Sequence, residues 1–571
     1  MSQSLLARLS PLWLREYRRD KLSGDMTAGF IVTVMLIPQS LAYAMLAGLP
    51  LEIGIYASIA PLIAYAIFGT SMTLAVGPVA VASLMTASAL APLATPGSPE
   101  YVAMAAQLAM ISGVMLFLFG VLRLGAVAHF LSHPVISGFI SGSAVLIAIS
   151  QVKHVIGISF PGRGVWENLI GLVSGVGRIN VATAALGLAS LIFLWWARGG
   201  LPKLLQRLGI KDSLASTLSK LAPMLAVVLT TLTVSFAGLD ATGVKVVGEV
   251  PSGLPSLAWE ALDWSNVSIL WGPALLIGLV GFVESISVAQ SLAIKRKQRI
   301  TPDKELLGLG AANMASALSG GYPVTGGFAR SVVNFAAGAQ TPLAGVISAI
   351  LMGLVLVGFT DWFEKLPQAV LAATIIVAVT SLIDLTTLRR AWKYDRADAV
   401  ALMATALGVI ALGVEIGVLL GVALSLGVVI WRSSHPHMAI VGRVPGTEHY
   451  RNVTRHKVET APDALAIRID ENLFFANAQI VEARLQSMVA KAGDSTRKVL
   501  LILSAVNQID STAVEMLEEF EHSLAIQGKE LWFAEVKGPV ADRLNKSELG
   551  SKMQSRTALS VNDLMGAWIK P

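Results

Sequence analysis

Long apolar stretches recur along the first three quarters of the chain, separated by short polar or basic connections. A helix that crosses a membrane needs about 20 mostly apolar residues. By this measure the sequence predicts about fourteen segments, at residues 26–47, 51–69, 78–92, 101–122, 125–152, 179–198, 222–239, 268–291, 303–319, 327–338, 341–359, 367–383, 397–412 and 414–431. We therefore expect an α-helical membrane protein.

The third and tenth segments are too short to span a membrane alone. Each follows a glycine or proline break, in LAVGPVAVASLM and YPVTGGFARSVVN. Because they hold the same place in two successive sets of seven segments, they predict an inverted repeat with substrate bound between two half-helices near the membrane midplane. Helix amino termini carry partial positive charge and free N–H groups, so two that converge form an anion site.

Charge density changes sharply along the chain. Mean hydropathy is +0.67 and only 14 % of the 571 residues are charged, which excludes an ordinary soluble protein. Roughly 11 % of residues are charged before about Arg432, against roughly 24 % after it. We predict a cytoplasmic segment at residues 1–25, a transmembrane domain at 26–432 and a soluble cytoplasmic domain at 433–571, whose balanced charge does not favour nucleic-acid binding.

Basic residues in the loops set the orientation. They follow even-numbered segments, as the positive-inside rule requires if both chain ends are cytoplasmic, and occur at Arg123, residues 198–220, Lys295–Arg299 and Arg389–Arg396. The first residues lack the apolar core and cleavage site of a signal peptide. We expect a multi-pass protein of the cell inner membrane.

Arg330 lies in the first turn of the second half-helix, where it adds a fixed positive charge. Glycines let the backbone approach a ligand, and proline at a helix start sacrifices no hydrogen bond. The alternative role for Arg330 is a structural clamp on backbone carbonyls. The predicted anion contacts at the two breaks are Gly77, Pro78, Val79, Gly326, Gly327, Phe328, Ala329 and Arg330.

Three more polar residues lie inside predicted segments. Gln39 and Tyr43 share one helix face, so both reach the substrate if Pro38 breaks the first segment; the alternative is hydrogen bonding between helices. Glu284 is the only acid of the eighth segment. Burying it charged costs roughly 3 kcal/mol or more, so it is protonated, exposed to a water-filled path, or paired with Arg330.

The run PQSLAYAMLAGLPLEIGIYASIAPLIAYAIFGTSMTLAVGP, from Pro38 to Pro78, resembles the signature of the sulfate permease family of anion transporters, and GFVESISVAQ and YPVTGGFARSVVN continue the resemblance. It departs at Met72, where many members carry arginine. The resemblance implies a seven-plus-seven inverted repeat with core and gate domains, usually in a homodimer. It leaves sulfate, related oxyanions, bicarbonate, chloride and dicarboxylates open as substrates.

Coupling to an ion is also implied by the resemblance, because the matching acid of the eighth segment lines the family's site. This assigns ion coupling to Glu284. We predict that the ion is a proton, because an ionised carboxylate would repel the anion that Arg330 and the half-helices attract, whereas a neutral one would not. Sodium-coupled members are expected to have aspartate there and a hydroxyl residue two positions before the arginine, whereas this chain has Phe328. Sodium is therefore the weaker alternative, with Ser287 and Thr325 as its remaining oxygen donors.

The tail resembles the STAS domain, an α/β fold shared with anti-sigma factor antagonists. In those proteins the serine of the matching turn, here Ser511 in IDSTAVEML, is phosphorylated, which implies a regulatory site and a cytoplasmic partner. A helix cap by Asp510 or Ser511 explains the same turn structurally.

Secondary active anion transport, driven by proton symport, accounts for these features together. An anion exchanger, a sodium-coupled symporter or an anion channel regulated by the STAS domain would share most of them. An enzyme is not indicated, since no nucleophile cluster or nucleotide-binding motif occurs. No cofactor or metal site is expected, and the absence of cysteine excludes thiolate ligands.

Overall fold

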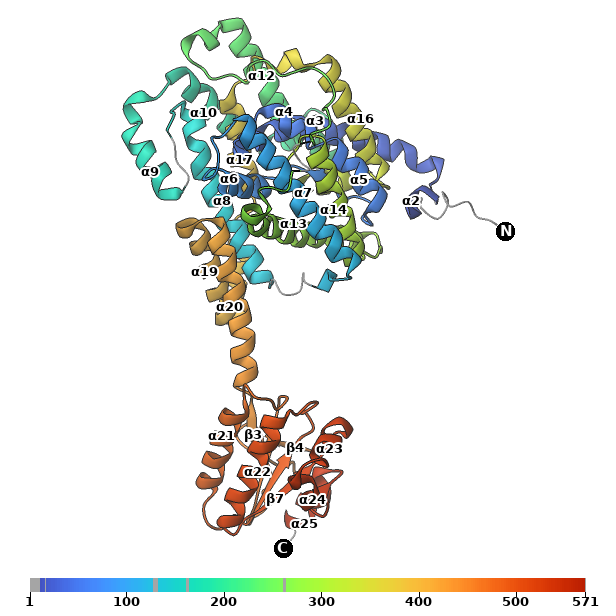
Figure 1. Cartoon of the computed structure of the whole chain (residues 1–571), viewed down its shortest axis with the longest axis vertical. Helices are drawn as coiled ribbons and strands as arrows, with labels where there is room; N and C mark the ends of the chain where they lie inside the picture. Colours follow the sequence, from blue (N-terminus) through green and yellow to red (C-terminus); the bar gives the residue numbers. More distant parts are fainter. Residues whose placement is uncertain (1–10, 16, 127–131, 161–163, 260–262, 570–571) are drawn as a thin grey trace, which may run out of the picture. The chain divides into compact units, whose positions relative to one another are not determined.

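The computed structural model describes residues 11–15, 17–126, 132–160, 164–259 and 263–569, and most of these residues are helical (Figure 1). Residue contacts divide the chain into two compact units, Met1–Ser425 and Leu426–Pro571. Helix α20 (Val414–Ser434) runs through the boundary predicted at residue 432. The domain limits at residues 25 and 432 therefore stay predictions.

Each of the first seven predicted segments contains a helix within the described residues. The helices are α3 (Leu22–Ala47), α4 (Leu51–Tyr56), α5 (Ala60–Phe68), α6 (Ala80–Leu90), α7 (Pro99–Val121), α8 (His133–Ile156), α10 (Val181–Arg207) and α12 (Ala222–Ala237). The second predicted segment contains α4 and α5, and Leu51–Phe68 together is one of the stretches long and apolar enough to cross a membrane. Pro61 is the second residue of α5, in the first turn, where its missing N–H costs no helical bond. Residues 127–131 of the fifth segment lie outside the described residues.

The later predicted segments also contain helices. Besides α20 they are α13 (Val267–Lys295), α14 (Pro302–Leu318), α15 (Phe328–Ala336), α16 (Leu343–Gly358), α17 (Gln368–Thr380) and α19 (Arg396–Leu412). The apolar pattern did not predict four shorter helices, α2 (Leu12–Arg15), α9 (Val165–Ser174), α11 (Asp212–Ser219) and α18 (Leu385–Tyr394). Four 3₁₀ turns complete the described helical structure of this unit, at Arg19–Lys21, Val176–Arg178, Leu239–Thr242 and Thr360–Phe363.

The composition of these helices suits a lipid environment. Eight helices among the described residues are long and apolar enough to cross a membrane, and three further apolar helices have 10–17 residues. Large apolar side chains such as Ile192, Trp195 and Phe236 are exposed on them. Such surfaces mark contact with a membrane or a partner, and the structure confirms the predicted helical membrane architecture.

Close packing joins the two halves of this unit. A Cβ atom added at Gly113 of α7 would lie 2.7 Å from the backbone nitrogen of Met314 of α14, and one added at Gly310 would lie 2.6 Å from that of Phe117. Small residues at membrane helix interfaces allow backbones to approach in this way. Helix α7 of the first seven segments is thus held directly against α14 of the second seven.

The two breaks are joined by a short antiparallel pair of strands, β1 (Val76–Gly77) and β2 (Thr325–Gly326). Val76 lies opposite Gly326, and Gly77 lies opposite Thr325. Since each strand leads almost at once into a helix, α6 and α15 begin beside each other. This is the arrangement expected at the centre of an inverted repeat.

The second unit is an α/β domain around a six-stranded sheet in the order β4-β3-β5-β6-β7-β8. The strands are β3 (Met438–Arg443), β4 (Tyr450–Asn452), β5 (Ala464–Ile469), β6 (Lys498–Ile502), β7 (Glu530–Ala534) and β8 (Thr557–Ala558). The helices are α21 (Ala478–Ala492), α22 (Ser511–Ile526), α23 (Gly538–Leu544), α24 (Glu548–Met553) and α25 (Val561–Ile569). Strands β5 to β8 are parallel, whereas β3 pairs antiparallel with β4 and β5.

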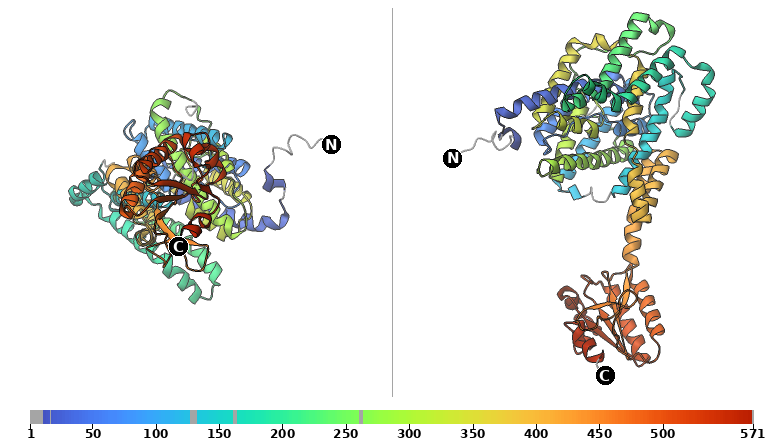
Figure 2. Two further views of the ribbon diagram at one scale, coloured as in Figure 1. Left: turned by 90° about the horizontal axis from the view of Figure 1, so that it is seen from below. Right: turned by 180° about the vertical axis from the view of Figure 1, so that it is seen from behind.

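Both faces of the sheet are covered, which explains the continuous apolar sequence of β6. Leu501 packs into a core shared with α21 and α22, and Leu500 packs on the opposite face with Met565 of α25. Helices therefore flank the sheet on both sides (Figure 2). The structure confirms the predicted α/β fold of the tail.

Candidate functional site

A cavity of about 560 Å³ lies in the first unit, between the starts of α6 and α15 and the helices α3, α10, α12, α13 and α17. Eight predicted site residues line it, namely Gln39, Tyr43, Val79, Glu284, Gly327, Phe328, Ala329 and Arg330. Five others do not, namely Gly77, Pro78, Ser287, Thr325 and Gly326. The structure thus brings most of the predicted residues to one water-accessible space.

Both half-helices begin at this cavity without a side-chain cap. Val79 precedes α6 and Gly327 precedes α15, and neither position supplies a capping side chain. The first helical hydrogen bond of α6 runs from Ser83 N to Val79 O at 3.0 Å. The first of α15 runs from Ser331 N to Gly327 O, also at 3.0 Å. The N–H groups of residues 80–82 and 328–330 precede these bonds, so they are the orphan donors of each helix.

Hydrogen bonds between the two breaks fix these helix starts. Gly327 N donates to Ala75 O at 3.1 Å, and Ala75 N donates to Ser331 Oγ at 2.9 Å. One turn further along α15, Asn334 Nδ2 donates to Thr73 O at 3.0 Å. The backbone around β1 is therefore tied to α15 itself, which keeps the two sets of orphan donors beside the same space.

Arg330 lies between the breaks and is only 2 % exposed. Among the described residues, its Nη1 and Nη2 atoms have no hydrogen-bond partner, so neither a backbone carbonyl nor the Glu284 carboxylate satisfies them. A Cβ atom at Gly77 would lie 3.0 Å from Nη1, and one at Gly327 would lie 2.8 Å from Nε. Glycine at both breaks leaves the space that the guanidinium group occupies.

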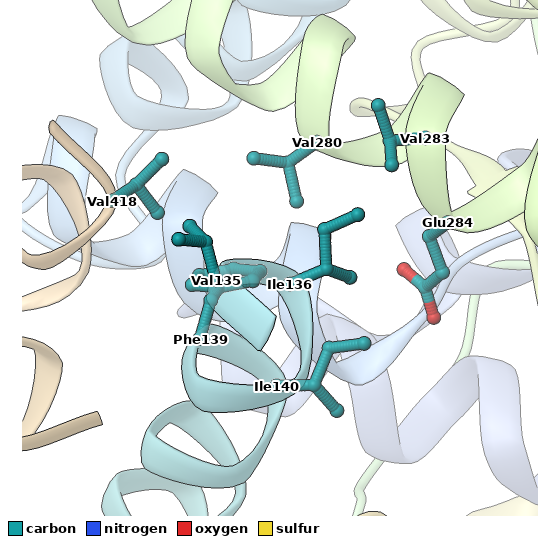
Figure 3. Close-up of a pocket in the computed structure, with 8 residues that line it drawn as sticks. All are labelled: Val135, Ile136, Phe139, Ile140, Val280, Val283, Glu284 and Val418. Carbon is teal, nitrogen blue, oxygen red and sulfur yellow. The ribbon is translucent and has the colours of Figure 1, made fainter. Parts of the chain in front are cut away.

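Glu284 of α13 lines the same cavity and is partly exposed. It also borders a small apolar pocket of about 20 Å³ formed with α8 and α20. Figure 3 shows its carboxyl group across from the aliphatic side chains of Ile136 and Ile140. An ionised carboxylate is poorly solvated on that side.

The two predicted oxygen donors for sodium, Thr325 and Ser287, lie in different environments. Thr325 is buried behind the cavity, where its Oγ1 donates to Gly281 O at 2.6 Å and lies 2.6 Å from Ser285 Oγ. Ser285 Oγ also accepts from Gly326 N at 2.8 Å. Ser287 is exposed and donates to Val283 O at 2.7 Å within its own helix. Ser285, which the sequence reasoning missed, is the hydroxyl that supports the second break.

Helix α3 carries Gln39 and Tyr43 to the cavity as a continuous helix through Pro38. The prediction that Pro38 breaks this helix is wrong. The two side chains still share one face because they lie four residues apart. Both side chains line the cavity, and no hydrogen bond from either to another helix occurs within the described residues.

Two basic residues at the cavity were not predicted as site residues. Arg198 in the second half of α10 and Lys220 before α12 both line it. Arg198 Nη2 donates to the Val377 carbonyl oxygen of α17. Sequence reasoning had counted both only as loop charges, although their place next to predicted segments was a usable signal.

Ser511 is exposed at the first position of α22 in the second unit. The cap of this helix is Asp510, whose Oδ1 accepts from Ala513 N at 2.9 Å and whose Oδ2 accepts from Phe475 N at 2.8 Å. Asp510 therefore supplies the structural role of this turn, and the Ser511 hydroxyl remains accessible.

Comparison with known proteins identifies the family. Residues 22–405 match the model described as the sulfate permease family. The chain belongs to the sulfate permease family. Residues 455–564 match the STAS domain.

Relatives of the sulfate permease family cover nearly the whole chain. Sulfate transporter 4.1, chloroplastic, of Arabidopsis thaliana is 35% identical over 520 residues, which is 89% of this chain and 74% of that protein. A probable sulfate transporter of Mycobacterium tuberculosis is 32% identical over 540 residues, or 94% of each protein. The protein is therefore a multi-pass anion transporter of this family with a STAS domain, and not an enzyme.

Solved structures share the fold. The structure of SLC26A9 has a TM-score of 0.86 at 20% identity and covers 97% of this chain and 91% of that one. The transmembrane domain of the cyanobacterial bicarbonate transporter BicA has a TM-score of 0.60 at 24% identity, over 72% of this chain and 99% of that one. At these identities the likeness shows the fold alone.

Proposed function

We propose that this protein is a secondary active transporter that binds one small anion in the 560 Å³ cavity and moves it by alternating access. Sulfate is the first candidate substrate, because the sequence relatives in Arabidopsis and Mycobacterium are named sulfate transporters. A related oxyanion, bicarbonate and a dicarboxylate are the other candidates.

One observation carries this proposal: two uncapped helix starts and a buried, unpartnered guanidinium group border the same cavity. Burying a charged group without partners is costly. An anion in contact with Arg330 and the orphan N–H groups would satisfy all of them together. Gln39 and Tyr43 add neutral donors that orient the anion without repelling it.

We further propose that the anion is carried together with a proton held by Glu284. An ionised Glu284 would repel the anion that Arg330 attracts, whereas a protonated carboxyl would not. Protonation and anion binding therefore favour each other, and linkage makes the two effects equal. The aliphatic surface of Ile136 and Ile140 beside Glu284 favours the neutral form as well.

Other coupling modes make different demands on the site. A sodium ion would need oxygen ligands beside Glu284, and the Thr325 and Ser285 hydroxyls are buried and bonded to each other. An exchanger would move anions in both directions without a proton gradient. A channel would conduct without saturating. These differences separate the alternatives in one vesicle assay.

The remaining parts of the proposal concern placement and regulation. We place the protein in the cell inner membrane as a homodimer, with both chain ends in the cytoplasm. Ser511 is proposed as a phosphorylation site that regulates the binding of a cytoplasmic partner to the STAS domain. A phosphate at the first position of α22 would be compatible with the helix, because a helix amino terminus stabilises negative charge.

The test uses purified full-length protein in liposomes, challenged with radiolabelled sulfate, bicarbonate, chloride and dicarboxylates. We expect saturable uptake of one class that follows an imposed proton gradient. Arg330→Ala should weaken binding of that anion on the order of 100-fold, since a buried charged hydrogen bond is lost. Arg178→Ala, an exposed arginine far from the cavity lining, is the matched control. Unchanged affinity in Arg330→Ala for every transported anion would refute the assigned site.

A further inference from the structure

Helix α18 joins two apolar helices of the first unit without belonging to the central site. It begins at Leu385, shortly after α17, and ends at Tyr394, directly before Asp395, the cap of α19. The stretch Gln368–Tyr394, which contains α17 and α18, is long and apolar enough to cross a membrane. The connection after this twelfth segment is cytoplasmic in the predicted topology. In that topology α18 lies where the bilayer core meets the cytoplasm.

One face of α18 is left open. Leu385, Arg389 and Trp392 share this face, because side chains three or four positions apart lie together on a helix. Leu385 is 58 % exposed, Trp392 is 53 % exposed, and Arg389 is exposed as well. Leu388 and Ala391 are only partly exposed, and α18 packs against α19 and α8. The open face therefore combines a large apolar surface with positive charge.

The positive charge of α18 is not compensated within the described residues. Arg389, Arg390 and Lys393 are exposed, the helix contains no acidic residue, and none of the three side chains forms an ion pair or hydrogen bond with a described residue. Helices that carry Lys and Arg together with Trp or Tyr are typical of the membrane interface, where the aromatic rings lie at the level of the headgroups. Trp392 and Tyr394 supply those rings, and Tyr394 is 93 % exposed. The charge of the helix suits the phosphate groups of acidic lipids.

Hydrogen bonds fix the start of α18 against α8. Asp384 caps the helix, since its Oδ1 accepts from Thr386 N at 2.9 Å and from Thr387 N at 3.0 Å. Asp384 N in turn donates to Ser141 Oγ of α8 at 3.2 Å. A displacement of α18 is therefore transmitted to α8.

The two helices connected to the start of α18 border the proposed transport site. Ser381 and Leu382, between α17 and α18, line the 560 Å³ cavity. Ser141 follows Ile140, whose side chain lies across from the Glu284 carboxyl group (Figure 3). A contact between α18 and the membrane surface thus acts on two walls of the site.

We propose that α18 is a binding site for acidic phospholipids of the cytoplasmic leaflet. Arg389, Arg390 and Lys393 contact the lipid phosphates, and Leu385 and Trp392 enter the boundary between headgroups and acyl chains. Bound lipid holds α18 at the bilayer surface, and through the helix cap it steadies α8 and the end of α17 during transport. The lipid binding is independent of which anion is carried, whereas the effect on uptake rests on the proposed transport function.

Lipid binding is tested with the full chain in nanodiscs of phosphatidylcholine that contain a trace of a photoactivatable lipid. The probe is either phosphatidylglycerol or phosphatidylcholine with the reactive group next to the headgroup, and labelled peptides are quantified by mass spectrometry. We expect the phosphatidylglycerol probe to label wild-type α18 more strongly. Replacing Arg389, Arg390 and Lys393 together by glutamine should lower that labelling on the order of tenfold or more, since each basic residue near an acidic lipid surface contributes roughly a factor of five.

Two matched variants control for charge. Replacing Arg389 and Arg390 by lysine keeps the charge and should keep the lipid selectivity. Arg455→Gln, Lys457→Gln and Lys546→Gln together remove the same charge from exposed positions of the second unit and should leave the selectivity unchanged. Equal labelling of wild-type α18 by the two probes would overturn the proposal and favour a soluble occupant of the open face. Selective labelling that survives in the glutamine variant of α18 would also overturn it.

The effect on transport is measured as initial sulfate uptake in liposomes of phosphatidylcholine alone and of equimolar phosphatidylcholine and phosphatidylglycerol. We expect phosphatidylglycerol to raise the rate severalfold in the wild type and in the control variant of the second unit, but not in the glutamine variant of α18. The same wild-type rate in both lipids would refute the link between α18 and the transport site. Absence of sulfate uptake in every lipid, with selective labelling intact, would refute sulfate as the substrate and support the lipid site alone.

Discussion

The contact between Gly327 and Arg330 allows a sharp test of how the central cavity binds its anion. Gly327→Ala adds one methyl group at the start of α15, where the backbone has φ −80° and ψ 126°, values that alanine adopts without strain. The new Cβ atom would lie 2.8 Å from Arg330 Nε and 2.9 Å from Nη2. The change therefore acts on the guanidinium group and not on the fold of the helix.

The expected size of the effect follows from that contact. Ordinary contacts begin at 3.4 Å, so the guanidinium group has to move by roughly 0.6 Å or more. Overpacking of this kind costs about 1–3 kcal/mol. Within the described residues Nη1 and Nη2 have no hydrogen-bond partner to lose, so the cost falls on anion binding, which requires the original position of the guanidinium group. This corresponds to a loss of anion affinity of roughly 5- to 150-fold.

The assay measures sulfate affinity in liposomes and thermal stability in detergent for four proteins: wild type, Gly327→Ala, Arg330→Ala and the double variant. Because the alanine acts through Arg330, the double variant should bind no more weakly than Arg330→Ala alone. Gly272→Ala in α13, where an added Cβ atom meets no heavy atom within 4 Å, is the matched control.

Two results would contradict this reasoning. Wild-type affinity in Gly327→Ala would mean that the guanidinium position is unimportant for binding. Additive losses in the double variant would mean that the methyl group acts on the anion directly or on the helix start, and not through Arg330.

Three further predictions use other parts of the chain. In Glu284→Gln, uptake driven by a proton gradient should lose its concentrating power with or without sodium, while anion binding or exchange remains; intact accumulation would place coupling elsewhere. A chain ended after Ser434 should still transport at a measurable rate, and folded protein that binds sulfate without moving it would refute this. Burial raises the pKa of Asp470, but hydrogen bonds from Arg468 and His437 outweigh it and lower that pKa. Their stabilisation is thus present above about pH 4 and lost as pH falls further. On acidification the protection factors of the β5 amides in the full chain, corrected for intrinsic exchange, should fall in wild type, but Asp470→Asn should lack that step.

Most of the fold was predictable from the sequence, because glycine, proline and long apolar runs constrain the local backbone strongly. Glycine and proline marked both breaks, and apolar length located the long helices but not the shorter α2, α9, α11 and α18. Apolar composition does not mark the turn between α4 and α5, because it continues there without interruption. Helix α18 was missed because its ten residues are mostly polar or basic.

Contacts between elements far apart in the chain could not be predicted from the sequence. Ser285 and Ser287 are chemically identical, and only the rotation of α13 against β2 decides that Ser285 supports Gly326. The pairing of β1 with β2 involves two residues on each side, too few for any periodic pattern. Arg198 and Lys220 become cavity residues only through the packing of α10 and α12 around α17.

The β1–β2 pair has a consequence for how the chain is made. During synthesis Val76 and Gly77 enter the bilayer long before Thr325 and Gly326 have been translated. Unpaired backbone groups in hydrocarbon cost several kcal/mol each, so the first break has to stay near water or beside the insertion machinery until the second arrives. A nascent chain that stops before Thr325 therefore displays an open polar break within the membrane. Such an unpaired break is a physical feature by which cellular quality control could distinguish an unfinished transporter from a complete one.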